Sequence, residues 1–362
     1  MDQINSKHVP FFILATIIVS AKTYPTIYTK NGGRESWIAM IIASIIMTLF
    51  LVYVIKASLK HNCFNLYDIY TSALGKPMGN IFIGFLLLTL FLTLVESAAV
   101  YSNALHNHLL MDTPVWFFLL LFLTSTLYTV KKDLVAIIIV TLIGIVLVTI
   151  SGINLAILTV KYKEVAYLLP VFERGVTIGF IKSIGQILGL FAGVIVIFPL
   201  LKRLGDTKNL LLYVVIGLLF ALQIHIVSLT GLFMTFDVHF INYMTYPNLF
   251  QTQLVSHFRF LEMGELFVML QIVGGWYLKY VITFYGLLSI LREMKQKSKY
   301  WVYGISIVVA ICAYFAGDNL FLLFKLLNYY TYIVLVNFFV IPLFVFGIFS
   351  KRGLQIASKD SI

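Results

Sequence analysis

Three ionisable side chains fall inside long apolar stretches of the sequence, namely Lys22, Glu96 and Lys279. A charged group is costly at membrane depth, where it usually faces a cavity or pairs with an opposite charge. Two interpretations follow from this placement. The three charges form ion pairs that brace helices, or they line a polar cavity that receives a solute, and both can hold together. The sequence leaves open which lysine meets Glu96.

Signatures of catalysis are absent from the chain. It contains no GxSxG, no HExxH, no phosphate-binding glycine loop, and no cysteine and histidine cluster. The two cysteines, Cys63 and Cys312, have neither metal-ligand nor redox spacing. We therefore expect a protein that is not an enzyme and that holds no cofactor and no metal.

The composition indicates that the elements carrying these charges are membrane spans. Hydrophobic residues make up 60% of the chain and charged residues 11%, against roughly 45–50% and about 25% in soluble proteins. The apolar runs are long and uninterrupted, which favours helices of about 20 residues over the short strands of a barrel. The sequence thus predicts an all-α polytopic membrane protein of about ten spans: His8–Thr29, Ser36–Ser58, Asn80–Leu110, Pro114–Val130, Leu134–Leu158, Phe180–Leu201, Leu210–Phe236, Glu262–Leu291, Tyr300–Ala316 and Leu320–Phe349.

The distribution of cations predicts the orientation. The formal net charge is +11, and most of the 26 lysines and arginines fall in the short loops on one side of these spans. The excess therefore follows the positive-inside rule, and we expect no nucleic-acid partner. It predicts that the N- and C-termini are both cytoplasmic, which requires an even number of spans.

Two of the predicted spans carry breaks in corresponding positions. In the first span, small and polar residues from Ser20 to Thr23 precede Pro25; in the sixth, Gly185, Gly189 and Gly193 precede Pro199. An alternative interpretation of the glycines in the sixth span is that residues of this size and spacing allow close packing against another helix. The first and sixth spans open two halves of five spans each, about residues 8–158 and 180–349 of a single transmembrane domain. Paired breaks of this kind indicate an inverted-repeat transporter fold with a midplane site, where helix N-termini could face a carboxylate and loosened carbonyls a cation.

Three connections are longer than a turn. Asn62–Gly79 lies on the inner side, and its apolar spacing predicts a short helix in the membrane interface. Thr159–Gly179 and Asp237–Leu261 lie on the outer side, where they are plausible lids over the membrane core.

Short sequence markers, in order and along nearly the whole chain, resemble one known family. They are RESWIAMII (34–42), NLYDIYTSALGKPMG (65–79), DTPVW (112–116), LLPVFERG (168–175), FPLLKR (198–203) and TYPNLF (245–250). The chain resembles the B subunits of spore germinant receptors, a branch of the amino acid/polyamine/organocation transporter superfamily.

The resemblance implies a function and a setting. It implies ten helices in a five-plus-five fold of the LeuT type with discontinuous helices 1 and 6, in the inner membrane of the spore. The partners it implies are an A subunit, a lipoprotein C subunit and the lipid bilayer. The ligand it implies is a small germinant, typically an amino acid. An alternative is a true transporter of amino acids or cations, and a third reading is a structural subunit with no ligand site.

The resemblance also implies which positions form the ligand site. The family's glycine-rich break falls on Ser20, Ala21 and Lys22, and its pocket positions fall near Thr93, Leu190 and Lys279. Together with the break residues Thr23 and Gly189, and with Glu96 as partner of a lysine or an ammonium group, these residues form the predicted site.

This sequence departs from the family at two places. Ser20 and Lys22 stand where glycines are common, and Glu262-Met263 replaces a Glu-Arg pair. Lys22 could hold the ligand's carboxylate by charge or occupy a vacated cation site.

Overall fold

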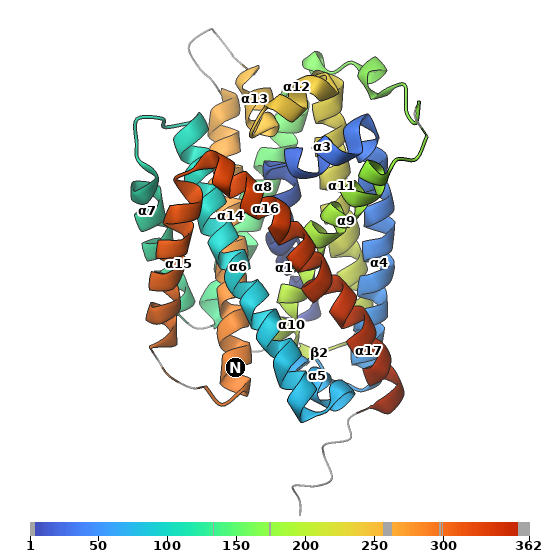
Figure 1. The fold of residues 1–362 in the computed structure, drawn as a ribbon. Coiled ribbons are helices and arrows are strands. Elements are labelled where there is room, and N and C mark those ends of the chain that lie inside the picture. Colours follow the sequence, from blue (N-terminus) through green and yellow to red (C-terminus); the bar gives the residue numbers. More distant parts are fainter. Residues whose placement is uncertain are drawn as a thin grey trace, which may run out of the picture.

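The fold is a bundle of helices, shown in Figure 1. The computed structural model describes residues 4–132, 134–173, 175–255, 263–296, 298 and 300–353. Its first half contains β1 (Ile4–Asn5), α1 (Val9–Ile17), α2 (Ser20–Thr23), α3 (Thr26–Gly32), α4 (Ser36–Lys60), α5 (Leu66–Leu74), α6 (Lys76–His108), α7 (Val115–Val130) and α8 (Leu134–Leu158), with short 3-10 turns at Ser6–His8, Gly33–Glu35, Val160–Tyr162 and Val165–Leu168.

The second half begins with an α-helix, α9 (Ile178–Ala192), that continues as the 3-10 helix η5 (Gly193–Ile197). The other elements of this half are α10 (Phe198–Leu201), β2 (Leu204–Asp206), α11 (Leu210–Thr235), α12 (Val238–Tyr243), α13 (Pro247–Gln253), α14 (Met263–Glu293), α15 (Trp301–Gly317), α16 (Leu320–Val334), the π-helix η6 (Leu335–Val340) and α17 (Ile341–Arg352).

The prediction of a polytopic helical membrane protein is confirmed. Among the described residues, seven helices are long and apolar enough to cross a membrane: residues 26–60, 76–108, 134–158, 178–201, 210–235, 266–293 and 320–352. Two further apolar helices, α7 and α15, are shorter. The expected bounds agree closely with the structure; the span expected at Leu134–Leu158 coincides with α8. Glu262, expected to begin the eighth span, lies outside the described residues.

Both described ends of the chain lie at the same end of the bundle, the lower end in Figure 1. β1 pairs in parallel with β2, with Ile4 opposite Leu204. Near the last described residue, Arg352 of α17 donates a hydrogen bond to the Ala73 carbonyl of α5, and α5 packs against α17. These contacts hold the described ends against elements far away in the sequence.

The first predicted span is interrupted in the structure. α1 ends at Ile17, and the four-residue α2 is separated from α3 by Tyr24, whose φ of −126° and ψ of 60° are not helical. Pro25 explains this conformation, because a proline disfavours helical backbone in the residue before it. Carbonyl groups at such a break need other donors. The Tyr28 hydroxyl donates to the Ala21 carbonyl at 2.8 Å, and the Asn248 amide of α13 donates to the Lys22 carbonyl.

The sixth predicted span changes from an α-helix to a 3-10 helix at Gly193. Pro199 supplies a cause, because its ring has no N–H for the Ile195 carbonyl four residues earlier. This segment is the most enclosed of the spans, with 89% of its apolar window buried. Gly189 allows the close approach of α16, because a Cβ atom there would stand 2.2 Å from the Thr331 carbonyl oxygen.

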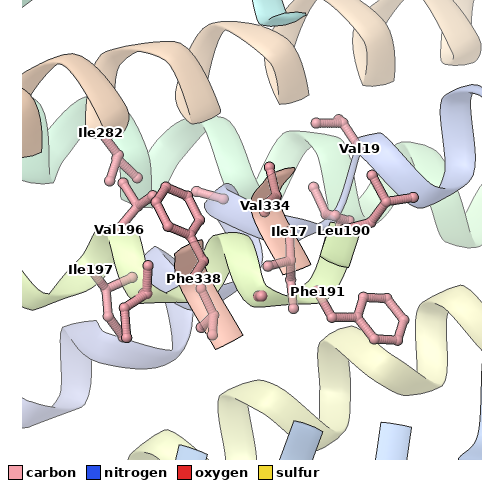
Figure 2. Packing of buried hydrophobic residues seen from close by; sticks show 14 of the residues in the cluster. Ile17, Val19, Leu190, Phe191, Val196, Ile197, Ile282, Val334 and Phe338 are labelled. Atoms are coloured by element: carbon pink, nitrogen blue, oxygen red, sulfur yellow. The ribbon is translucent and has the colours of Figure 1, made fainter. Parts of the chain in front are cut away.

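The apolar core surrounds this enclosed helix. Figure 2 shows Leu190 and Phe191 of α9 together with Ile17 and Val19 of the first predicted span and Phe338 of η6. All five belong to one cluster of buried side chains. The two interrupted segments therefore meet in the middle of the bundle.

The longer connections contain helices. The predicted helix between Asn62 and Gly79 is α5, which begins after the Asn65 side chain caps the Tyr67 N–H at 3.0 Å. Its apolar face packs against α6 and α17, so that Ile69 and Tyr70 are fully buried. The outer connection after α11 contains α12 and α13, and its residues 256–261 lie outside the described part of the chain.

Candidate functional site

The Glu96 carboxylate accepts hydrogen bonds from side chains of three other helical segments. Its Oε1 accepts from Ser20 Oγ at 2.9 Å and from the Tyr24 hydroxyl at 2.6 Å. Its Oε2 lies 2.5 Å from Lys279 Nζ and 3.0 Å from the Tyr330 hydroxyl. The carboxylate is thus paired with a cation and surrounded by donors, which is what a buried charge requires.

The remaining atoms of this cluster complete its hydrogen bonding. Lys279 Nζ also donates to Ser20 Oγ at 2.6 Å and lies 5.1 Å from the centre of the Trp276 ring. Tyr330 lies 2.9 Å from Thr93 Oγ1, and Thr93 itself donates to the Thr89 carbonyl. We call Ser20, Tyr24, Thr93, Glu96, Lys279 and Tyr330 the Glu96 cluster. It joins α2, α6, α14 and α16 into one unit.

Lys22 has a different environment, although it is only two residues from Ser20. Its ammonium donates to Gln271 Oε1 on α14, and it forms no ion pair within the described part of the chain. The Gln271 side chain is buried, and its Nε2 donor has no hydrogen-bond partner among the described residues. Lys22 Nζ and Gln271 Nε2 are therefore two neighbouring donors whose hydrogen-bonding capacity the protein leaves partly unused.

A cavity of about 360 Å³ lies beside these two donors. The break around α1 and α2 forms one wall, and α8, α11, α13 and α14 form the others. Its polar lining comes from Lys22, Thr23, Thr149, Thr159, Lys163, Gln223, Ser228, Asn248, Gln251, Thr252 and Gln271, and its apolar lining includes Val148, Ile224, Val268 and Ile272.

The charge of the cavity lining is one-sided. Lys22 and Lys163 bring positive charge, and no aspartate or glutamate is among the described lining residues. A group that accepts hydrogen bonds and carries negative charge matches ammonium and amide donors of this kind. The arrangement can therefore hold a carboxylate beside Lys22 and an apolar body against the walls of α8 and α14.

The structure divides the predicted site residues into three sets. Lys22 and Thr23 line the cavity. Ser20, Thr93, Glu96 and Lys279 belong to the Glu96 cluster. Ala21, Gly189 and Leu190 lie in packing contacts, Ala21 with its carbonyl bonded to Tyr28 and Gly189 against α16. The lysine that meets Glu96 is Lys279.

Several residues of the cavity lining and of the Glu96 cluster were not predicted from the sequence. Gln271 is an amide inside an apolar span, a weaker signal than a charge, and Lys163 reads as an ordinary loop cation. Asn248 lies in the TYPNLF marker, and Pro247 sets the start of the helix that carries it. Nothing in the sequence distinguishes Tyr24 and Tyr330, as donors to Glu96, from the other tyrosines of the chain.

The sequence matches one protein family over most of its length. Residues 3–322 match the family described as spore germination protein. The chain belongs to the spore germination protein family. No curated protein matches it. Most of the described helices, and the cavity beside Lys22, lie within the matched residues.

Proposed function

We propose that this spore germination protein is the germinant-sensing membrane subunit of a receptor, and that it binds the carboxylate of a small molecule between Lys22 and Gln271. The observation that carries the proposal is the pair of donors at the cavity wall. Lys22 has an amide for a partner instead of a carboxylate, and Gln271 Nε2 has no partner among the described residues. Of the nine buried side-chain atoms that have no hydrogen-bond partner among the described residues, Gln271 Nε2 is the one on a residue that lines this cavity. Buried polar atoms are usually paired, so a bound anion is a natural partner for both donors.

The size and lining of the cavity support an amino acid as the ligand. A volume of about 360 Å³ lies near the lower limit of small-molecule sites. Hydroxyl and amide oxygens of Thr149, Ser228 and Gln251 line it and can accept from an ammonium group. The aliphatic side chains of Val148 and Ile272 offer a surface for an apolar side chain. We propose that the germinant is an amino acid with an apolar side chain.

A short helix connects the cavity with the Glu96 cluster. α2 carries Lys22 toward the cavity and Ser20 toward Glu96 and Lys279. A ligand shifts a conformational equilibrium only by binding one state more tightly than the other. We propose that a carboxylate on Lys22 favours one position of α2, which the Glu96 cluster transmits to α6, α14 and α16.

The membrane arrangement belongs to the same proposal. We propose ten crossings in a five-plus-five inverted repeat, with α1 to α3 and α9 to α10 as its two discontinuous helices. Both termini are then cytoplasmic, and the protein acts in the spore inner membrane with an A subunit and a lipoprotein C subunit. The breaks at Tyr24–Pro25 and Gly193 support this proposal.

A germination assay tests the proposal. Spores that carry this protein as their only receptor B subunit are exposed to a panel of L-amino acids, and the most effective one is titrated. Lys22→Met is expected to shift the half-maximal concentration upward by about thirtyfold or more, because a charged partner is worth about 2 kcal/mol or more at a buried site. Membrane levels are compared by immunoblot. A variant that is present at normal levels and responds at the same concentration contradicts the proposal.

Alternating-access transport is the second candidate function. The two interrupted helices favour it, because discontinuous helices at corresponding positions form the solute site of many transporters. Proteoliposomes containing the purified chain decide between the two functions. Saturable, gradient-driven accumulation of the same labelled amino acid supports transport, whereas binding without accumulation supports sensing.

A further inference from the structure

A second cavity, of about 920 Å³, lies at the end of the bundle opposite α12 and α13. It is formed where α7 and α14 end and α15 begins, at the lower left in Figure 1. No residue of this cavity belongs to the proposed germinant site or to the Glu96 cluster.

The rim of the second cavity is basic. Lys131, Lys132 and Arg292 line it, and all three side chains are exposed. Within the described residues none of the three forms an ion pair, and the adjacent Glu293 is paired with Lys202 at 2.6 Å. Asp133 follows Lys132 in the sequence and lies outside the described residues. The three cations therefore have two carboxylates next to them in the chain, and one of these, Glu293, is paired with Lys202.

The floor and sides of the cavity are apolar and aromatic. Leu288 and Leu291 of α14 form part of the lining. Tyr300, Trp301 and Tyr303 stand at the start of α15, and the Lys131 ammonium lies 5.1 Å from the centre of the Tyr303 ring. Tryptophan and tyrosine gather at the level of lipid headgroups in membrane proteins.

Two of the helices that border the cavity also expose apolar side chains along their length. On α15, Ile307 and Ile311 follow Trp301 along the helix and are exposed, at 61% and 53%. On α7, Leu121 and Tyr128 are also exposed. A molecule seated among the three cations would therefore extend an apolar part along α7 or α15.

We propose that this cavity binds the headgroup of an anionic phospholipid. The phosphate would accept hydrogen bonds from Lys131, Lys132 and Arg292, the glycerol would lie at the level of Trp301, and an acyl chain would follow α15. Basic pockets between membrane helices recognise anionic headgroups by this combination of charge and depth. Inorganic phosphate shares the headgroup chemistry but lacks the acyl chains that the exposed α15 surface fits.

Lipid titration of the purified full chain tests the proposal. The protein in neutral detergent is titrated with phosphatidylglycerol, cardiolipin or phosphatidylcholine, and bound lipid is counted by native mass spectrometry. Each cation near the headgroup is expected to raise the affinity for anionic lipid roughly fivefold, so three cations raise it on the order of one hundredfold. We therefore expect the variant K131Q/K132Q/R292Q to lose its preference for anionic lipid by about that factor.

Matched controls separate this site from general charge. K56Q/K76Q/K351Q removes three exposed lysines at the same end of the bundle that do not line the cavity, and we expect it to retain the preference. K131R/K132R/R292K keeps the charge and is expected to bind as the natural chain does. Equal loss in the control triple, or no loss in the cavity triple, overturns the proposal. Displacement of lipid by millimolar inorganic phosphate would also overturn it, because the site would then bind a free anion.

Discussion

The two membrane-buried lysines, Lys22 and Lys279, occupy contrasting regions of one molecule. Lys279 lies 2.5 Å from Glu96, and both carboxylate oxygens of Glu96 accept hydrogen bonds within the protein. Lys22 has only the Gln271 amide oxygen among side-chain partners and borders a cavity. In the sequence the two lysines look alike, because each is a cation within an apolar run.

The difference between them is whether the protein supplies a counter-charge, and the proposed function rests on the lysine that has none among the described residues. An ion pair that is complete within the protein braces the helices that supply it, and breaking it is costly. A cation with a neutral partner remains available to an anion from outside. The predictions below test whether the two regions separate in this way, beginning with the largest expected effect.

Removing the cation of the Glu96 cluster is expected to have the largest effect on folding. Lys279→Met leaves the Glu96 carboxylate buried without its counter-charge, which should reduce the free energy of unfolding by about 3–5 kcal/mol. Unfolding of the purified protein in mixed micelles of SDS measures this change.

The matched variant E96Q/K279M removes both charges and is expected to regain most of the stability, because no uncompensated charge remains. If Lys279→Met were as stable as the natural chain, the cluster would not brace the helices and the contrast between the two lysines would disappear.

Substitution of the other lysine is expected to affect ligand response and not folding. Lys22→Met exchanges an ammonium group for an apolar one beside a cavity, so the unfolding free energy should change by less than about 1 kcal/mol. The half-maximal germinant concentration should still rise by about thirtyfold or more. A loss of stability as large as that of Lys279→Met would show that the two lysines have the same role.

Filling the cavity is expected to weaken binding without changing any charge. Gly152 of α8 lines the cavity, and a Cβ atom there would stand 3.4 Å from Gln271 Nε2, which is ordinary contact. The rest of a leucine side chain would therefore enter the cavity. We expect Gly152→Leu to raise the half-maximal concentration by about tenfold, a loss of about 1.4 kcal/mol of binding free energy.

Gly84→Leu is the control for this substitution, because a Cβ atom there meets nothing within 4 Å. The control should respond as the natural chain does. An unchanged response of Gly152→Leu, at normal membrane levels, would place the ligand elsewhere.

The smallest effect is expected at α13, in the outer connection after α11. Asn248→Ala removes the hydrogen bond to the Lys22 carbonyl, worth about 1 kcal/mol, and should raise the half-maximal concentration by about fivefold. Asn242→Ala, which removes the partner of Thr29 at 2.9 Å in the neighbouring α12, is the control. Equal effects of both changes would mean that the outer connection acts only through stability.

Much of the fold could be predicted from the sequence because lipid imposes simple rules. Long apolar runs predicted helices such as α4, α8 and α11, since backbone groups in lipid must bond within their own segment. The interruption before Pro25 could be predicted because proline restricts the residue that precedes it. Both effects are local in the chain.

The division of the site could not be predicted in the same way. The pairing of Glu96 with Lys279 joins residues separated by 183 positions, and it depends on how α6 and α14 are rotated about their axes. The same holds for Gln271, whose amide is recognised as part of the site only when it is seen beside Lys22. The family resemblance named the helices of a site, whereas the cavity beside Lys22 lies between the break and α8, α11, α13 and α14.

Equilibrium binding of the labelled amino acid most effective in germination tests the central claim most directly. It is measured on the purified natural chain, on Lys22→Met and on E96Q/K279M. We expect Lys22→Met to lose binding by about thirtyfold or more, while E96Q/K279M keeps an affinity within about tenfold of the natural chain. Retained binding by Lys22→Met together with lost binding by E96Q/K279M would contradict the account, because the ligand would then be held by the Glu96 cluster.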